Sequence, residues 1–157
     1  MSVVISGTGL FTPKDFITNE ELVESYNKYV DISNLENEKA IASGEIDALT
    51  HSDAAFIKKV SGIEKRYVLD KEGILNPQRM RPNLAERPND QISIQAEISI
   101  SACKEALDQA GRSANDVDAV ICGCANLQRA YPAVAIEIQK ELGIEGYAYD
   151  MNVACSS

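Results

Sequence analysis

The spacing of apolar residues along the chain predicts that strands and helices alternate. The longest helix is expected from Ile92 to Ala110, where Ala96, Ile100 and Leu107 recur on one face at helical spacing. Short apolar runs predict strands at residues 3–5, 66–69, 118–122 and 147–153. Further helices are expected where the helical spacing recurs, at residues 18–30, 52–62 and 132–143. A short, more polar and largely exposed helix is expected at residues 34–43.

Polar and small residues mark where these helices begin and end. Thr18, followed three residues later by a glutamate, has the pattern of a capping box. Ser52 and Asp53 are expected to begin the helix that carries Phe56 and Val60 on its buried side. The glycines at positions 62, 111 and 143 are expected to end three of the helices.

This order of elements predicts an α/β fold with a mostly parallel sheet. In open α/β sheets, ligands bind beside the carboxyl ends of strands, and Cys155 follows such an end. The segment Gly7–Gly9 lacks the third glycine of a dinucleotide-binding fingerprint, so we interpret its glycines as structural.

The least regular stretch is Asp70–Asp90, which contains three prolines. It also gathers Arg79, Arg81 and Arg87 within an acidic chain. A loop of this length in a compact domain is usually functional or mobile. Two interpretations remain open: the arginines receive a phosphate or an acidic carrier protein, or the stretch is a solvated surface loop.

Composition narrows the class of protein. A chain of 157 residues is long enough for one compact domain. The net charge of −9 argues against nucleic acid as a partner, and no apolar run approaches the length needed to span a membrane. With no signal peptide in the pattern of its first residues, we expect a cytoplasmic protein with reduced cysteines. The spacing of Cys122 and Cys124 does not match known zinc sites, so no metal is expected.

Cys155 is the candidate nucleophile. The small residues from Ala154 onward suit a sharp turn from the last strand into a helix. At a helix N-terminus, unpaired N–H groups and the helix dipole stabilise a thiolate, which is a good nucleophile for acyl transfer from a thioester. The alternative is that Cys155 is a small buried core residue, as free cysteines commonly are.

Six stretches, taken together and in order, resemble β-ketoacyl-acyl-carrier-protein synthase III of the thiolase-like superfamily. Each stretch alone is weakly specific, but the ordered set, closed by Asp150 and Ala154-Cys155, is specific to this superfamily. The stretches are Ile5–Pro13, Ser61–Arg66, Ala106–Gly111, Asp116–Ile121, Tyr131–Gly143 and Tyr149–Cys155.

The resemblance implies a thiolase-like αβαβα layered fold made of two similar halves, of which residues 1–157 are the N-terminal one. It implies that Cys155 accepts an acyl group at the buried N-terminus of a helix. The acyl group is then condensed with malonyl on acyl carrier protein, with loss of carbon dioxide, in fatty-acid or related biosynthesis. The implied enzyme is a homodimer without a bound cofactor, in which Tyr131 reaches into the acyl pocket of the partner subunit.

The sequence departs from the family pattern in three respects. The family's catalytic histidine and asparagine belong to the second half, so we expect that half to be a separate part of a longer protein. The tryptophan and arginine of the family's coenzyme A groove are replaced by Phe56 and Val60, with Lys58 or Lys59 as substitutes for the charge. The segments at residues 34–49 and 70–90 resemble insertions that reshape the tunnel entrance.

The sequence therefore predicts an acyltransferase with Cys155 as nucleophile, Tyr131 as a pocket residue, and Ser52 and Phe56 at the donor entrance. The donor is acyl-coenzyme A or an acyl group on the phosphopantetheine of a carrier protein. Two alternatives stay open: a non-catalytic thiolase-like scaffold subunit, and a condensing enzyme of secondary metabolism.

Overall fold

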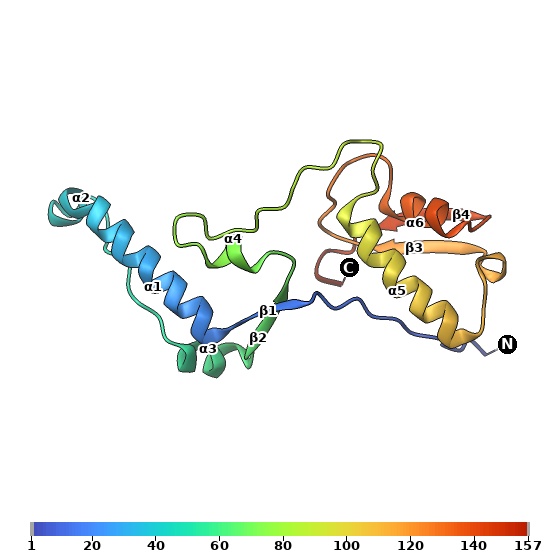
Figure 1. The fold of residues 1–157 in the computed structure, drawn as a ribbon, viewed down its shortest axis with the longest axis horizontal. Coiled ribbons are helices and arrows are strands. Elements are labelled where there is room, and N and C mark those ends of the chain that lie inside the picture. The colour runs from blue at the N-terminus through green and yellow to red at the C-terminus, as the bar shows by residue number, and fades with distance from the viewer. Residues whose placement is uncertain (1, 157) are drawn as a thin grey trace. The chain divides into compact units, whose positions relative to one another are not determined.

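Two small sheets of two strands each organise the computed structural model, which describes residues 2–156. They belong to two compact units of the chain. One unit is Thr12–Ala85, and the other combines the N-terminal segment through Phe11 with the chain from Glu86 onward. Figure 1 labels the elements of both units.

The unit Thr12–Ala85 is built on an antiparallel strand pair and one long helix. In it, Phe16 pairs with Tyr67 and Ile17 with Arg66. Ile17 and Val30 form the buried apolar part of this unit. The elements are β1 (Asp15–Thr18), α1 (Asn19–Glu36), α2 (Glu38–Ala42), α3 (Ala54–Ser61), β2 (Lys65–Val68) and α4 (Lys71–Leu75).

The predicted capping box at the start of α1 is confirmed. The backbone N–H of Glu21 donates to Thr18 Oγ1 at 3.2 Å, and the backbone N–H of Thr18 donates to Glu21 Oε2 at 3.0 Å. Two donors that a helix start leaves unpaired are therefore satisfied reciprocally. Lys71 of α4 lies 2.6 Å from the same Glu21 carboxylate, which joins α4 to α1.

The stretch Asp70–Asp90 contains a helix that the sequence analysis missed. Asp70 begins α4 by accepting from the backbone N–H of Gly73 at 3.1 Å, and its other oxygen accepts from the N–H of Asn83. Both bonds hold the pKa of the Asp70 carboxyl below its usual value, and the bond from Asn83 has the larger effect. A helix of five residues is too short to show a helical period, which explains the miss.

The other unit packs two helices against a parallel strand pair. Figure 1 shows α5 and α6 beside β3 and β4. The core is a single apolar cluster to which α5, α6 and β3 contribute buried residues. The elements are α5 (Ile94–Ala110), a 3-10 turn at Ala114–Asp116, β3 (Ala119–Gly123), α6 (Val134–Leu142), β4 (Tyr147–Met151) and a 3-10 turn at Ala154–Ser156. The buried cluster comprises Ala96, Ile100, Val120, Val134, Ala135, Ile138 and Ile144.

The prediction of a buried strand at residues 3–5 is wrong. Val3, Val4 and Ile5 are extended but unpaired, and between 76% and 100% exposed. A strand needs hydrogen bonds from a neighbouring strand, and none of the strands among residues 2–156 pairs with this segment. The first strand lies instead at Asp15–Thr18.

The N-terminal segment is held against α5 further along, at the two glycines. A Cβ on Gly7 or Gly9 would lie 2.2 or 1.9 Å from a backbone oxygen of α5. The backbone N–H of Thr8 donates to Gln109 Oε1 at 2.6 Å. Gly7 and Gly9 therefore permit close packing, which confirms the structural interpretation of these glycines.

The α/β class is confirmed, and so are most of the helix ends. Glycines at positions 62, 111 and 143 adopt positive φ angles of 70°, 61° and 68° and end α3, α5 and α6. Pro132 lies two residues before α6 rather than in its first turn.

Candidate functional site

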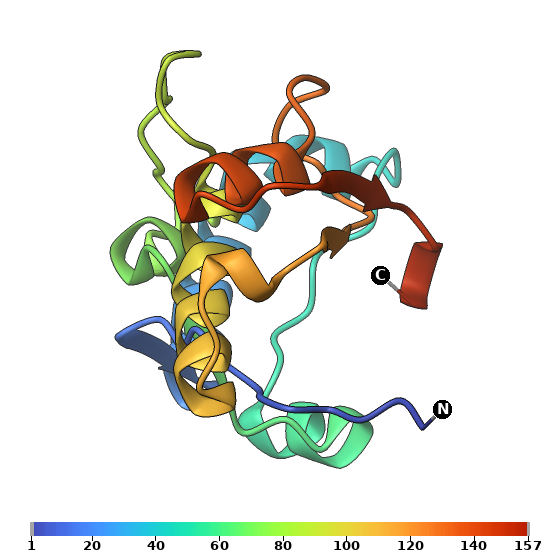
Figure 2. The ribbon, with the colours of Figure 1, turned by 90° about the vertical axis from the view of Figure 1, so that its right-hand side faces the viewer.

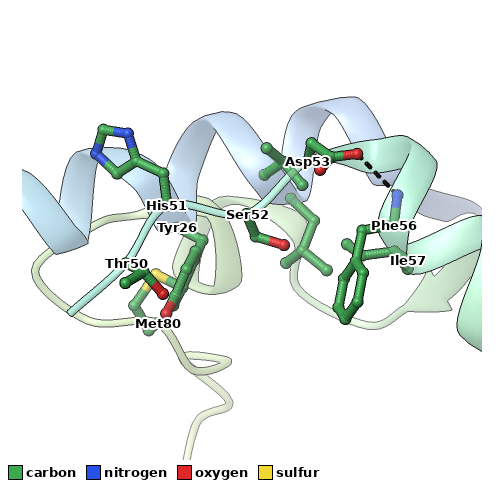
Figure 3. Close-up of a pocket in the computed structure, with 10 residues that line it drawn as sticks. Tyr26, Thr50, His51, Ser52, Asp53, Phe56, Ile57 and Met80 are labelled. Carbon is green, nitrogen blue, oxygen red and sulfur yellow. Dashed lines mark hydrogen bonds between the residues drawn. The ribbon is translucent and has the colours of Figure 1, made fainter.

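A pocket in the unit Thr12–Ala85 contains two of the predicted site residues, Ser52 and Phe56 (Figure 3). Its volume is 610 Å³, which is within the usual size of small-molecule sites. The walls come from α1, from the segment that precedes α3, from α3 itself and from Met80. Its lining is Leu22, Val23, Tyr26, Thr50, His51, Ser52, Asp53, Phe56, Ile57 and Met80.

Two asparagines of α1 hold the wall segment in place. The side chain of Asn27 donates to Ser52 O at 3.1 Å and accepts from the N–H of Ser52 at 2.9 Å. One helical heptad later, Asn34 makes the same pair of bonds with Leu49, both at 2.9 Å. At both residues a side-chain amide pairs with the backbone N–H and C=O, as a neighbouring strand would do. Segment 49–52 is therefore fixed against α1.

Asp53 and Phe56 define the other side of the pocket. Asp53 Oδ1 accepts from the backbone N–H of Phe56 at 2.7 Å, which caps α3 as the sequence predicted (Figure 3). The prediction that Phe56 and Val60 are buried is wrong, since they are 56% and 64% exposed. Ala54 and Ile57 are the partly buried apolar residues of α3 instead. An exposed ring in a pocket wall is available to a ligand, whereas a core ring is not.

His51, the single histidine of the chain, is committed to a neighbour. Its Nε2 lies 2.7 Å from Asp31 Oδ1, and both side chains are more than half exposed. Among residues 2–156, no group of three or more histidine, cysteine or carboxylate side chains is placed to hold a metal.

Tyr131 and Cys155 belong to the other unit. Tyr131 lies three residues before α6 in the irregular segment that follows β3, and it is 87% exposed, so its ring projects from the surface. Cys155 is exposed and lies within the 3-10 turn Ala154–Ser156 that follows β4. Figure 2 shows this short turn in red near the C-terminal end of the chain. The resemblance implied a buried helix N-terminus at this position, and the turn Ala154–Ser156 instead spans three residues.

The other cysteines are less suited to act as nucleophiles. Cys103, Cys122 and Cys124 are free and partly buried. Burial raises the pKa of the Cys103 thiol. Burial also raises the pKa of Cys122, with a further contribution from the negative charge of Asp150. A raised pKa reduces the thiolate fraction at neutral pH.

Asp150 has a structural role that the sequence alone did not reveal. Its carboxylate accepts from the backbone N–H groups of Val134 at 2.9 Å and Ala135 at 2.8 Å, which are the first two residues of α6. Ala133, at the cap position of α6, has no side chain that accepts such bonds. The absence of a local cap was the available signal that a carboxylate from elsewhere must supply one. Asp150 therefore joins β4 to the helix that follows Tyr131.

Comparison with known proteins places these features in a family. No family model matches the chain. Over 135 residues the chain is 58% identical to a beta-ketodecanoyl-acyl-carrier-protein synthase of Pseudomonas aeruginosa, covering 86% of this chain and 39% of the relative. Over 151 residues it is 29% identical to a beta-ketoacyl-acyl-carrier-protein synthase III of Clostridium perfringens, covering 96% of this chain and 33% of the relative. The chain is therefore similar, over most of its length, to part of a β-ketoacyl-acyl-carrier-protein synthase III.

Solved structures agree on the fold of this synthase III-like domain. A 3-oxoacyl-acyl-carrier-protein synthase III from Aquifex aeolicus matches with a TM-score of 0.61 at 24% identity, over 97% of this chain and 35% of that one. OleA of Xanthomonas campestris matches with a TM-score of 0.61 at 16% identity, over 96% of this chain and 35% of that one. The predicted thiolase-like fold class is thereby confirmed.

The domain spans between 33% and 39% of the length of these two curated relatives. No helix among residues 2–156 is long and apolar enough to cross a membrane. The predicted residues fall into two groups: Ser52 and Phe56 share one pocket, and Tyr131 and Cys155 lie in the unit that contains β3 and β4.

Proposed function

We propose that the protein is a β-ketoacyl-acyl-carrier-protein synthase and that this domain carries its acyl-accepting cysteine. The observation that carries the proposal is the 58% identity, over most of the chain, to a beta-ketodecanoyl-acyl-carrier-protein synthase. The position of Cys155 just after the parallel strand β4 supports it, because ligands in α/β sheets bind beside the carboxyl ends of strands.

The reaction has two steps. The thiolate of Cys155 attacks the carbonyl carbon of an acyl thioester, a new C–S bond forms, and the donor thiol leaves after taking up a proton. Malonyl on acyl carrier protein then loses carbon dioxide, and the electron pair of the broken C–C bond forms a new C–C bond to the acyl carbonyl. Cys155 leaves as its thiolate, and the product is a β-ketoacyl group on the carrier protein.

The same comparison supports an eight-carbon acyl donor. A product with a decanoyl chain has ten carbons, and the condensation adds two of the three malonyl carbons. An octanoyl thioester therefore supplies the remainder. We propose that the protein works in the cytoplasm as a homodimer, that its carrier-protein partner presents malonyl, and that Tyr131 enters the acyl pocket of the partner subunit.

We further propose that the pocket containing Ser52 and Phe56 receives the coenzyme A or phosphopantetheine part of the donor. Its size and its exposed aromatic ring support this assignment. Phe56→Ala should raise KM for octanoyl-coenzyme A with little change in kcat, because the ring contributes equally to ground-state and transition-state binding. Phe16→Ala, which removes an exposed phenylalanine of the same unit outside the pocket lining, is the matched control.

The test of the function is covalent labelling of the full-length protein. We expect octanoyl-coenzyme A to give one acyl adduct by intact mass, mapped to Cys155 and lost in Cys155→Ala. Cys124→Ala, which removes a different free thiol of the same unit, should keep the adduct. A folded protein that gives no adduct with coenzyme A or carrier-protein donors of any chain length would refute the proposal and favour a non-catalytic scaffold.

A further inference from the structure

The segment that ends in Tyr131 is anchored although it has no helix or strand of its own. We define the Tyr131 loop as residues 124–131, the irregular segment after β3. Tyr131 is 87% exposed at its end, yet the preceding residues bond to the first turn of α5 and to the residues just before it. An exposed ring on a fixed base is suited to act on something outside its own chain.

Two glutamines form the first anchor by exchanging backbone bonds. Gln95 Oε1 accepts from the N–H of Gln128 at 2.6 Å, and Gln128 Oε1 accepts from the N–H of Ile94 at 2.8 Å. Gln95 Nε2 also donates to Asn126 O and lies 3.2 Å from Cys124 Sγ. One amide of α5 therefore binds three residues of the Tyr131 loop.

A buried ion pair forms the second anchor, two residues before Tyr131. Arg129 Nη2 donates to Gln91 O at 2.8 Å and lies 3.5 Å from Glu137 Oε1. The side chains of Arg129 and Glu137 are 14% and 6% exposed. Glu137 also accepts from the N–H and the Oγ of Ser93, at 2.9 and 2.7 Å. Because a buried charge is costly unless it is paired, Arg129 has little freedom to leave this position.

The third anchor lies after Tyr131, where Asp150 accepts from the N–H groups of Val134 and Ala135. Tyr131 thus stands between Arg129 and Val134, both held in place. The residues that hold the Tyr131 loop do not line the pocket of Ser52 and Phe56, and none of them is the proposed nucleophile.

We propose that Gln95 and Arg129 are positioning residues that set acyl-chain specificity, by fixing how far the Tyr131 ring extends into the acyl pocket of the partner subunit. The inference rests on the proposed function, in which Tyr131 closes that pocket. A side chain at the end of an acyl pocket excludes a longer acyl chain only if it cannot move away. The hydrogen bonds of the Tyr131 loop hold the ring in place, and removing them lets the ring move out of the pocket.

The test measures the acylation of Cys155 by acyl-coenzyme A donors of increasing chain length in the full-length protein. In Gln95→Ala we expect kcat/KM for donors longer than the preferred one to rise, relative to the preferred donor, by about tenfold, the low end of the discrimination that one methylene supplies in an apolar pocket. Arg129→Lys, which keeps the positive charge beside Glu137 and loses the planar guanidinium, should shift the profile in the same direction.

Gln109→Ala is the matched control. Gln109 is a glutamine of the same helix, and its side chain accepts from the N–H and Oγ1 of Thr8 at 2.6 and 3.0 Å. It therefore also ties an extended segment to α5, but not the Tyr131 loop. We expect Gln109→Ala to change stability without changing the chain-length profile.

A double variant distinguishes positioning of the Tyr131 ring by Gln95 from a general loss of structure in the Tyr131 loop. In a Tyr131→Ala background the ring is gone, so Gln95→Ala should no longer alter the profile. The proposal is overturned if the profiles of Gln95→Ala and Arg129→Lys equal the wild-type profile, or if Gln95→Ala shifts the profile equally without the ring. In either case the octanoyl adduct on Cys155 would persist, so the proposed function would stand. A wild-type protein that accepts no acyl group would overturn both.

Discussion

Asp150→Asn is the change that most directly tests how β4 is joined to the start of α6. The Asp150 carboxylate receives two backbone N–H groups at the start of α6, at 2.9 and 2.8 Å. An asparagine keeps one carbonyl oxygen, so it can accept from those groups at that atom, but its amide nitrogen is a donor and faces another donor. The negative charge at the positive end of the helix is lost as well.

The size of the loss follows from these contacts. A hydrogen bond to a charged group contributes about 1.5–3 kcal/mol, and loss of a helix cap typically costs about 1 kcal/mol. Because Asp150 is half-buried and one acceptor remains, we expect Asp150→Asn to lower the free energy of unfolding by about 1–2 kcal/mol. That corresponds to a Tm lower by about 2–8 °C for a domain of this length. Asp150→Ala, which leaves both N–H groups without this partner, should lose about 2–4 kcal/mol.

The assay is denaturant unfolding, together with the pH dependence of Cys122 alkylation. The negative charge of Asp150 contributes to the raised pKa of Cys122, so Asp150→Asn should lower that pKa and let alkylation begin at a lower pH. Asp108→Asn, an exposed substitution on α5, is the control and should change neither quantity. If Asp150→Asn matches wild type in both measurements, the capping role assigned to Asp150 is refuted.

Three further changes test other parts of the structure. Gly9→Ala places a methyl group 1.9 Å from a backbone oxygen of α5, so denaturant unfolding should show a loss of about 1–3 kcal/mol; an unchanged midpoint would contradict the close packing. Asn27→Ala removes both bonds to Ser52 and should cost about 1–3 kcal/mol, with faster hydrogen exchange at the Ser52 amide; unaltered exchange there would show that the clamp is unimportant. Iodoacetamide should modify Cys155 first, because Cys155 is exposed, and modify Cys103 at higher pH, because burial raises the Cys103 pKa; peptide mapping that finds Cys103 first would contradict this order.

Local chemistry allowed most helices to be predicted from the sequence. Thr18 and Asp53 cap their helices through contacts with residues three positions away, so the signal lies within one turn of chain. The strands before and after α6 were also found, because both are short, mostly apolar runs in which more and less exposed residues alternate. These features depend on neighbours in sequence, which a single chain displays.

The wrong predictions concern residues whose burial or pairing depends on segments distant in sequence. The run Val3–Ile5 has the composition of a buried strand, but a strand also requires a partner edge, and composition does not supply one. Phe56 was assigned to the core on helical spacing, although Ala54 and Ile57 are the partly buried apolar residues of that helix.

The candidate site divides in the same way. Cys155 could be proposed from its local sequence, and Tyr131, Ser52 and Phe56 only from the resemblance. The residues that hold the surrounding backbone, Gln95 among them, act across more than thirty positions and carry no motif.

The amide clamps on segment 49–52 have a consequence for how the pocket can change. Asn27 and Asn34 bind the main chain of Ser52 and Leu49, and every residue type except proline offers the same N–H and C=O groups. Mutations at Thr50, His51 and Ser52 can therefore accumulate without dislodging the strip that carries them. Evolution could therefore change which ligands this pocket wall accepts by exchanging side chains while the backbone stays in place. A library randomised at these three positions should contain many folded variants that differ in ligand preference.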